Sequence, residues 1–166
     1  YKIKEGMVTD EMFKKFRAHV FRILYCPIHG CCGYNPWTAN LADIQDAAKM
    51  NAWKRYIKYV VDRWGAYVDF WEFFNEYDPN PAWFQIMVPY IKSIDPYNHI
   101  VTSNGAVPAT IFDALTAHCY SGSAATTVDL DQDYYINWYG ADARTKPYLF
   151  TEYGNQGPYS NYHPAR

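Results

Sequence analysis

The chain has 166 residues and a formal net charge of −2, which suits one domain with room for a substantial core. This near-neutral charge gives no electrostatic reason to expect nucleic acid or an anionic membrane as a partner. No run approaches the roughly 18 apolar residues of a membrane span, and no signal-peptide pattern opens the chain. The start at Tyr1, without an initiator Met, predicts a processed, truncated or partly represented polypeptide.

The first half of the chain alternates helical and strand-like patterns. A short amphipathic stretch over 9–16 leads into an apolar run over 19–28, which we expect to be a strand. The clearest helix pattern follows over 50–64, and Gly65 predicts its end. Its apolar residues recur at spacings of three and four: Met50, Trp53, Ile57, Val60 and Trp64.

The second half continues the alternation. In order, it predicts a strand over 68–75, a helix from Pro81 to Asp95, a strand over 100–103, a weaker helix over 110–115, a strand over 117–120, a loop over 121–127, a helix over 134–143 and a strand over 147–151. Strands that are apolar throughout belong to a parallel sheet covered by helices. Residues 1–166 are therefore expected to form a single α/β domain.

Four cysteines leave three interpretations open. Cys26, His29, Cys31 and Cys32, with Cys119 further along, superficially resemble a zinc cluster. Structural zinc usually takes two separated pairs of ligands, however, and adjacent cysteines cannot easily present both sulfurs to one ion. The two alternatives are a disulfide from Cys26 to Cys31 or Cys32, and free buried thiols. We expect no metal and no cofactor.

Two acids follow aromatic, strand-like runs. Glu76 comes after Asn75 at the end of the run over 70–74, and Glu152 follows the run over 147–151. Active sites of parallel α/β folds lie at the carboxyl ends of the strands. Bulky apolar walls raise a carboxyl pKa, as a general acid near neutral pH requires. Glu76 is also placed to cap the next helix, and Glu152 to be a solvated rim carboxylate.

Other polar residues at strand ends complete the candidate site. Tyr120 is a hydrogen-bond donor for Glu152 if their strands are neighbours, and His118 shares its face by the two-residue strand period. A buried core histidine is the alternative for His118. Glu72 lies mid-strand, either as a paired core charge or facing the helices. The aromatic content, 17 Tyr, 9 Phe and 6 Trp, suits both a large core and a sugar-binding cleft.

These motifs resemble those of clan A glycoside hydrolases, and most closely family 5-like endo-β-glycanases (cellulases and β-mannanases). Residues 63–65 and 68–76 resemble the region of the fourth strand, where Asn75-Glu76 matches the acid/base motif. His118-Cys119-Tyr120 resembles the His-x-Tyr of the sixth strand, and residues 151–154 resemble the nucleophile motif of the seventh. The resemblance covers about 16–157.

The resemblance implies a (β/α)₈ TIM-type barrel of which this chain supplies strands three to seven. Such a barrel takes about 250 residues, so strands one, two and eight have no sequence here. Because open sheet edges associate readily, we expect the chain to be part of a longer protein, with the remainder of the barrel or other chains as partners.

The resulting hypothesis is a secreted, retaining β-glycoside hydrolase that degrades β-linked polysaccharide or oligosaccharide. Glu152 is the expected nucleophile and Glu76 the acid/base, with carboxyl groups about 5–5.5 Å apart. Substrate-binding candidates are Asn75, His118, Tyr120, Trp37, Trp83, Tyr77 and Tyr153. Extracellular localisation is inferred from the substrate class. The alternative is a non-catalytic component with a structural or carbohydrate-binding role in a larger assembly.

Overall fold

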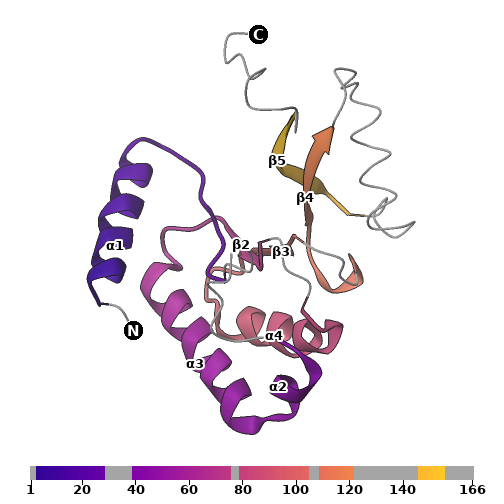
Figure 1. Ribbon diagram of the computed structural model, residues 1–166. Coiled ribbons are helices and arrows are strands. Elements are labelled where there is room, and N and C mark those ends of the chain that lie inside the picture. Colours follow the sequence, from indigo (N-terminus) through magenta and orange to yellow (C-terminus); the bar gives the residue numbers. More distant parts are fainter. Residues whose placement is uncertain (1–2, 29–38, 76–78, 105–108, 122–145, 156–166) are drawn as a thin grey trace.

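A computed structural model describes residues 3–28, 39–75, 79–104, 109–121 and 146–155 (Figure 1). Its elements, in order, are α1 (Ile3–Ala18), β1 (Leu24–Tyr25), α2 (Leu41–Gln45), α3 (Ala47–Trp64), β2 (Phe70–Phe73), α4 (Pro81–Ile94), β3 (Ile100–Ser103), the 3₁₀ helix η2 (Ala109–Ile111), β4 (Leu115–Ser121) and β5 (Tyr148–Asn155). Among these residues, no helix is both long and apolar enough to cross a membrane.

All strand pairs in the described part are parallel. β1, β2 and β3 form one sheet in that order, and β4 pairs with β5 in a second. A parallel bridge between Asn104 and Thr116 links β3 to β4. The five strands therefore follow one another in space as they do in the chain, without the reversal of order that marks a doubly wound sheet. The α/β prediction is confirmed, and the described residues do not close a barrel.

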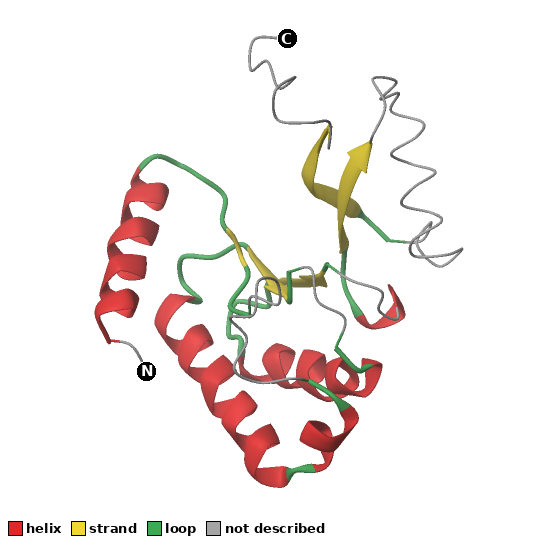
Figure 2. Ribbon diagram, in the orientation of Figure 1, coloured by secondary structure: helices red, strands yellow, loops and turns green. Residues whose placement is uncertain are grey.

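Helices cover one face of the three-stranded sheet, with α3 and α4 together on that side in Figure 2. Trp71 and Phe73 of β2 point toward these helices, since the indole of Trp71 reaches Asp95 at the end of α4 and the ring of Phe73 lies 5.2 Å from that of Trp83. Glu72, between them in a regular strand, lies on the opposite face, as does its register partner Thr102.

The predicted helices over 50–64 and 81–95 are confirmed, and side-chain caps explain where they begin. Asp46 accepts hydrogen bonds from two backbone N–H groups at the start of α3, and Asn80 accepts one at the start of α4. Gly65 follows α3 in a right-handed conformation, with its N–H bonded to the carbonyl of Val61. A Cβ at Gly65 would lie 2.7 Å from that carbonyl oxygen, so the close approach requires glycine.

The strand expected over 19–28 is mostly wrong. α1 runs to Ala18, and Val20 then adopts a left-handed φ of 62°. The N–H of Phe21 bonds the carbonyl of Phe16, and that of Val20 bonds Arg17, which is the Schellman arrangement at a helix C-terminus. The rings of Phe16 and Phe21 pack 5.7 Å apart across it. Only Leu24–Tyr25 remains as strand.

Two other elements differ from the sequence prediction. The helix expected over 110–115 is the single turn Ala109–Ile111, because Leu115 already begins β4. The last strand does not stop before Glu152 but continues to Asn155. The predicted strand over 100–103 is confirmed as β3. The helix expected over 134–143 and most of the loop over 121–127 lie outside the described residues.

Candidate active site

The pairing of β4 with β5 brings two predicted site residues together. His118 pairs with Glu152, and Tyr120 pairs with Gly154, so the expectation that these strands are neighbours is confirmed. The register shifts between Ala117, which pairs with Phe150, and His118. Thr151 is thus an extra residue of β5, a bulge directly before Glu152. The side chains of Tyr120, Glu152 and Tyr153 lie outside the described part.

Asn75 lies two residues beyond the end of β2 and is half-buried. The residue before it, Phe74, has a left-handed φ of 57° and no exposed surface. The backbone N–H of Asn104 donates to the carbonyl of Phe74 at 3.3 Å, which ties the end of β2 to the end of β3. Asn75 and Asn104 therefore follow the carboxyl ends of neighbouring parallel strands, which is where the active sites of such folds lie. Glu76 and Tyr77 lie outside the described residues, as does Trp37.

A buried carboxylate lies below these strand ends. Glu72 is 3% exposed, and the hydroxyl of Thr116 in β4 donates to its Oε1 at 2.6 Å. Because β3 lies between β2 and β4, this hydrogen bond spans a strand and joins the two parts of the sheet. The sequence left Glu72 open between two roles, and the structure makes it a hydrogen-bonded group on the face away from the helices.

Cys26 lies beside Glu72 on the same face. Its thiol donates to the carbonyl of Ile28 at 3.2 Å. Burial, and secondarily the charge of Glu72, raises the pKa of the Cys26 thiol to about 12, so it stays protonated at neutral pH. Cys26 is a free thiol, contrary to the disulfide alternative. No group of three potential metal ligands occurs among the residues that the structure describes, and Cys31 and Cys32 lie outside them.

The prediction that Trp83 lines a sugar subsite is wrong. Its indole has no exposed surface and lies at the centre of the aromatic core, within 4.9–5.5 Å of four rings. These rings belong to Trp53, Phe73, Phe74 and Phe84. Trp83 lies in the first turn of α4, on the side of that helix that faces the core. The sequence showed only that Trp83 stood next to loop-forming residues.

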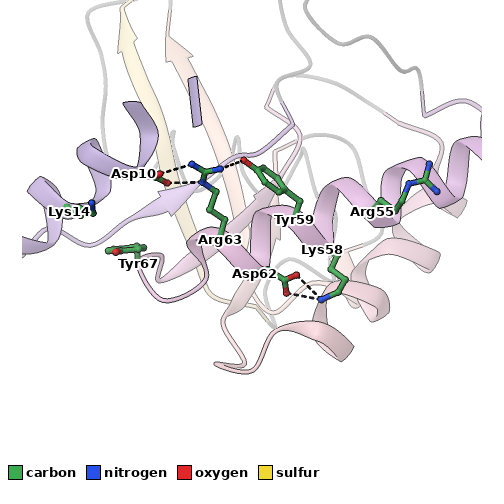
Figure 3. A pocket seen from close by; sticks show the side chains of 8 residues that line it. All are labelled: Asp10, Lys14, Arg55, Lys58, Tyr59, Asp62, Arg63 and Tyr67. Atoms are coloured by element: carbon green, nitrogen blue, oxygen red, sulfur yellow. Dashed lines mark hydrogen bonds and ion pairs between the residues drawn. The ribbon is translucent and has the colours of Figure 1, made fainter. Parts of the chain in front are cut away.

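An open groove of about 770 Å³ lies on the outer side of the molecule, between α1 and α3 (Figure 3). The guanidinium of Arg63 donates two hydrogen bonds to the carboxylate of Asp10, at 2.9 and 2.7 Å. This pairing holds the pKa of Asp10 at about 2, and the indole N–H of Trp64 donates to the same carboxylate. The groove is remote from the strand ends, and its charged groups are largely paired, which indicates a structural contact between two helices.

The structural neighbours of this chain are glycoside hydrolases. A β-glucuronidase from Ruminococcus gnavus matches with a TM-score of 0.63 and 15% identity, over 87% of this chain and 28% of that chain. Its complex with an N1-substituted uronic isofagomine matches with a TM-score of 0.60 and 15% identity, over 87% and 26%. A glycoside hydrolase family 5 mannosidase from Rhizomucor miehei matches with a TM-score of 0.44 and 16% identity, over 64% and 34%.

The likeness to the β-glucuronidase shows a glycoside hydrolase fold. At 15% identity it assigns no family and no activity. The chain spans 28% of the length of that enzyme, so the fold seen here corresponds to a part of it. No family model matches the chain, and no curated protein matches its sequence.

Proposed function

We propose that this chain is part of a retaining β-glycoside hydrolase. The observation that carries the proposal is the pairing of His118 with Glu152, midway along the parallel strands β4 and β5. Asn75 lies at the end of β2 in the same direction, directly before Glu76 in the sequence. The glycoside hydrolase fold of the chain supports the same reaction class.

In the proposed reaction, Glu152 attacks the anomeric carbon while Glu76 protonates the departing glycosidic oxygen. Water that Glu76 deprotonates then attacks the covalent glycosyl-enzyme and releases the sugar with retained configuration. Tyr120, two residues beyond His118 in β4, donates a hydrogen bond to Glu152. Asn75 and His118 bind sugar hydroxyls near the cleavage point. Trp37, Tyr77 and Tyr153 remain proposed subsite residues.

The proposal includes further strands from the remainder of a barrel. Within the described residues, β1 and β5 are each paired on one side only. The face of α1 that turns away from the rest of the chain carries exposed apolar side chains among charged ones: Ile3, Met7, Val8, Met12 and Phe16. Further strand–helix units beside β1 would cover both the sheet edge and this helix face. In this proposal, the remaining strands of the barrel belong to the same polypeptide or to another chain of an assembly. The proposed localisation is extracellular.

Chemical rescue of the full natural protein tests the two carboxylates separately. We expect E152A to lose turnover of aryl β-glycosides, and azide to restore it with formation of an inverted glycosyl azide. The matching variant E76A should give a retained azide, because Glu152 still forms the glycosyl-enzyme and azide, which needs no general base, then attacks it in place of water. E11Q, a change at an exposed acid on α1, is the control and should turn over normally. Unchanged activity of E152A would exclude it as the nucleophile.

The second candidate is a non-catalytic component that binds carbohydrate or supports a larger assembly. It is motivated by the short span, since the chain covers only 28% of the β-glucuronidase. Intact mass and N-terminal sequencing of the natural protein distinguish the two. A longer polypeptide that hydrolyses β-glycans supports the enzyme, whereas a mature chain of this length that binds them without hydrolysis supports the component.

A further inference from the structure

Phe74 has a backbone conformation that a bulky residue rarely adopts. Its φ of 57° lies in the left-handed region, directly between the end of β2 and Asn75. Non-glycine residues seldom occupy this region, and for an aromatic residue it marks either a turn or stored strain. The surrounding structure must therefore hold Phe74 in place.

The left-handed residue changes which side chains face the helices. In a regular strand Phe73 and Phe74 would point to opposite faces of the sheet. Here both rings contact the same indole, since they lie 5.2 and 4.9 Å from the ring of Trp83. The alternation is therefore displaced by one residue at Phe74, as in a bulge that redirects a side chain. Asn75 consequently does not share the helix-facing side with Phe73.

Packing in the aromatic core stabilises the left-handed backbone at Phe74. The Phe74 ring has no exposed surface, and its neighbours are Trp53 of α3 at 6.1 Å and Phe84 of α4 at 5.9 Å, besides Trp83. The carbonyl of Phe74 accepts a hydrogen bond from the N–H of Asn104, and the hydroxyl of Ser103 donates to the carbonyl of Phe73. Helices and sheet thus both fix the backbone at this position.

We propose that Phe74 is a positioning residue of the hydrolase, an inference that rests on the proposed function. The ring anchors the left-handed backbone in the aromatic core, and this backbone directs Asn75, and the acid that follows it in sequence, toward the substrate. Phe74 itself touches no substrate. Loosening the anchor should therefore misplace the acid while leaving the attack by Glu152 intact.

Leaving-group dependence separates this role from a structural one. A 2,4-dinitrophenyl β-glycoside departs without protonation, whereas a methyl β-glycoside needs the acid. We expect F74L to lower kcat/KM for the methyl glycoside by about 10²-fold, the range of general acid catalysis, with little change for the dinitrophenyl glycoside. The matched control is F112L, because Phe112 is buried to a similar degree and its ring lies 5.1 Å from that of Phe84.

F112L should lower both activities by the same factor. Should F74L fail to fold, F84L gives a milder test, because it removes part of the packing against the Phe74 ring without changing the strand. We expect F84L to show the same selective loss on the methyl glycoside. Equal losses on both substrates in F74L, or in F84L, would overturn the proposal. Absence of hydrolysis by the wild-type protein would instead overturn the proposed function, and this inference with it.

Discussion

His118 and Glu152 lie opposite each other in the parallel pairing of β4 with β5, one residue out of step with the pairs that precede them. Both proposed carboxylates thus come after a local irregularity, a bulge at Thr151 and a left-handed residue at Phe74. Such irregularities at the ends of strands commonly redirect side chains next to active sites.

The position of His118 predicts a direct role in substrate binding. We expect H118Q to lower kcat/KM by about 2–10-fold on aryl β-glycosides, the cost of one hydrogen bond to a neutral sugar hydroxyl at about 0.5–1.5 kcal/mol. H19Q is the control, because His19 is exposed where α1 ends. Steady-state kinetics on both variants checks this. Equal kcat/KM for H118Q and wild type would contradict a substrate contact.

The hydrogen bond from Thr116 to Glu72 should stabilise the fold. Replacing Thr116 by Val removes the donor and leaves a buried carboxylate with one partner fewer, at a cost of about 1.5–3 kcal/mol. Thr102 offers a matched control: it is equally buried, and its hydroxyl has no hydrogen-bond partner among the residues that the structure describes. T102V should therefore be neutral or stabilising. Urea unfolding of both variants measures the difference, and equal destabilisation would contradict the assigned role of Thr116.

The elements predicted correctly from the sequence are those with strong local signals. α3 has a regular apolar period and α4 has a capping Asn80 followed by Pro81, so both could be placed without tertiary information. β3 is short, but Asp95-Pro96 before it and Asn104-Gly105 after it mark its ends in the sequence. The sequence made Tyr120 a partner of Glu152 on the condition that their strands are neighbours, and the pairing of β4 with β5 meets that condition.

The failures share a different cause. Val20, Phe74 and Thr151 each break a periodicity, and each does so because of packing that the local sequence does not reveal. The location of Trp83 beside loop-forming residues gave the wrong environment for its side chain, which is fully buried. The fold class can be predicted because it follows from sequence patterns that repeat along the chain. The direction of a site residue's side chain depends instead on single positions that break those patterns.

Val20 is a position where stability can be gained. Its left-handed φ of 62° at the end of α1 strains a β-branched residue, and its side chain is exposed, so no packing is lost on replacement. V20G should stabilise the protein by about 1 kcal/mol, the left-handed strain less the flexibility that Gly adds to the unfolded chain. V8G, at an exposed Val inside α1, should destabilise it by a few tenths of a kcal/mol. Thermal unfolding that ranks V20G below wild type would contradict the strain argument.

The pairing of Asp10 with Arg63 predicts a pH dependence. Hydrogen bonding to Arg63 lowers the pKa of Asp10 from 3.8 to about 2. Because the folded pKa is the lower one, the stabilisation is fully present above about pH 4 and is lost as the pH falls through 2. D10N should be less stable than wild type at pH 7, and the difference should shrink at pH 2. Urea unfolding at both pH values checks this.

E11Q is the control for that series, because Glu11 is the adjacent acid on the exposed side of α1 and pairs with Lys14 at the surface. It removes the same charge without touching the contact between α1 and α3. Its stability difference from wild type should be small at both pH values. A D10N difference that stays constant between pH 7 and pH 2 would show that the carboxylate charge contributes nothing.

The two buried tryptophans Trp71 and Trp83 differ in one hydrogen bond, and this predicts different effects of the same substitution. The indole N–H of Trp71 donates to the carboxylate of Asp95 at 3.1 Å, whereas that of Trp83 has no hydrogen-bond partner within the described ranges of the chain. Trp→Phe removes similar volume from both fully buried sites. W71F should therefore be more destabilising than W83F by about 1.5–3 kcal/mol in urea unfolding.

The same W83F variant also tests the core location of Trp83. Since the indole has no exposed surface, W83F should bind an oligosaccharide as tightly as wild type in isothermal titration calorimetry, even where its free energy of unfolding is reduced. A sugar platform would behave in the opposite way, because a smaller ring would weaken binding while the fold kept its stability. Weaker oligosaccharide binding by W83F at unchanged stability would place Trp83 in a subsite after all.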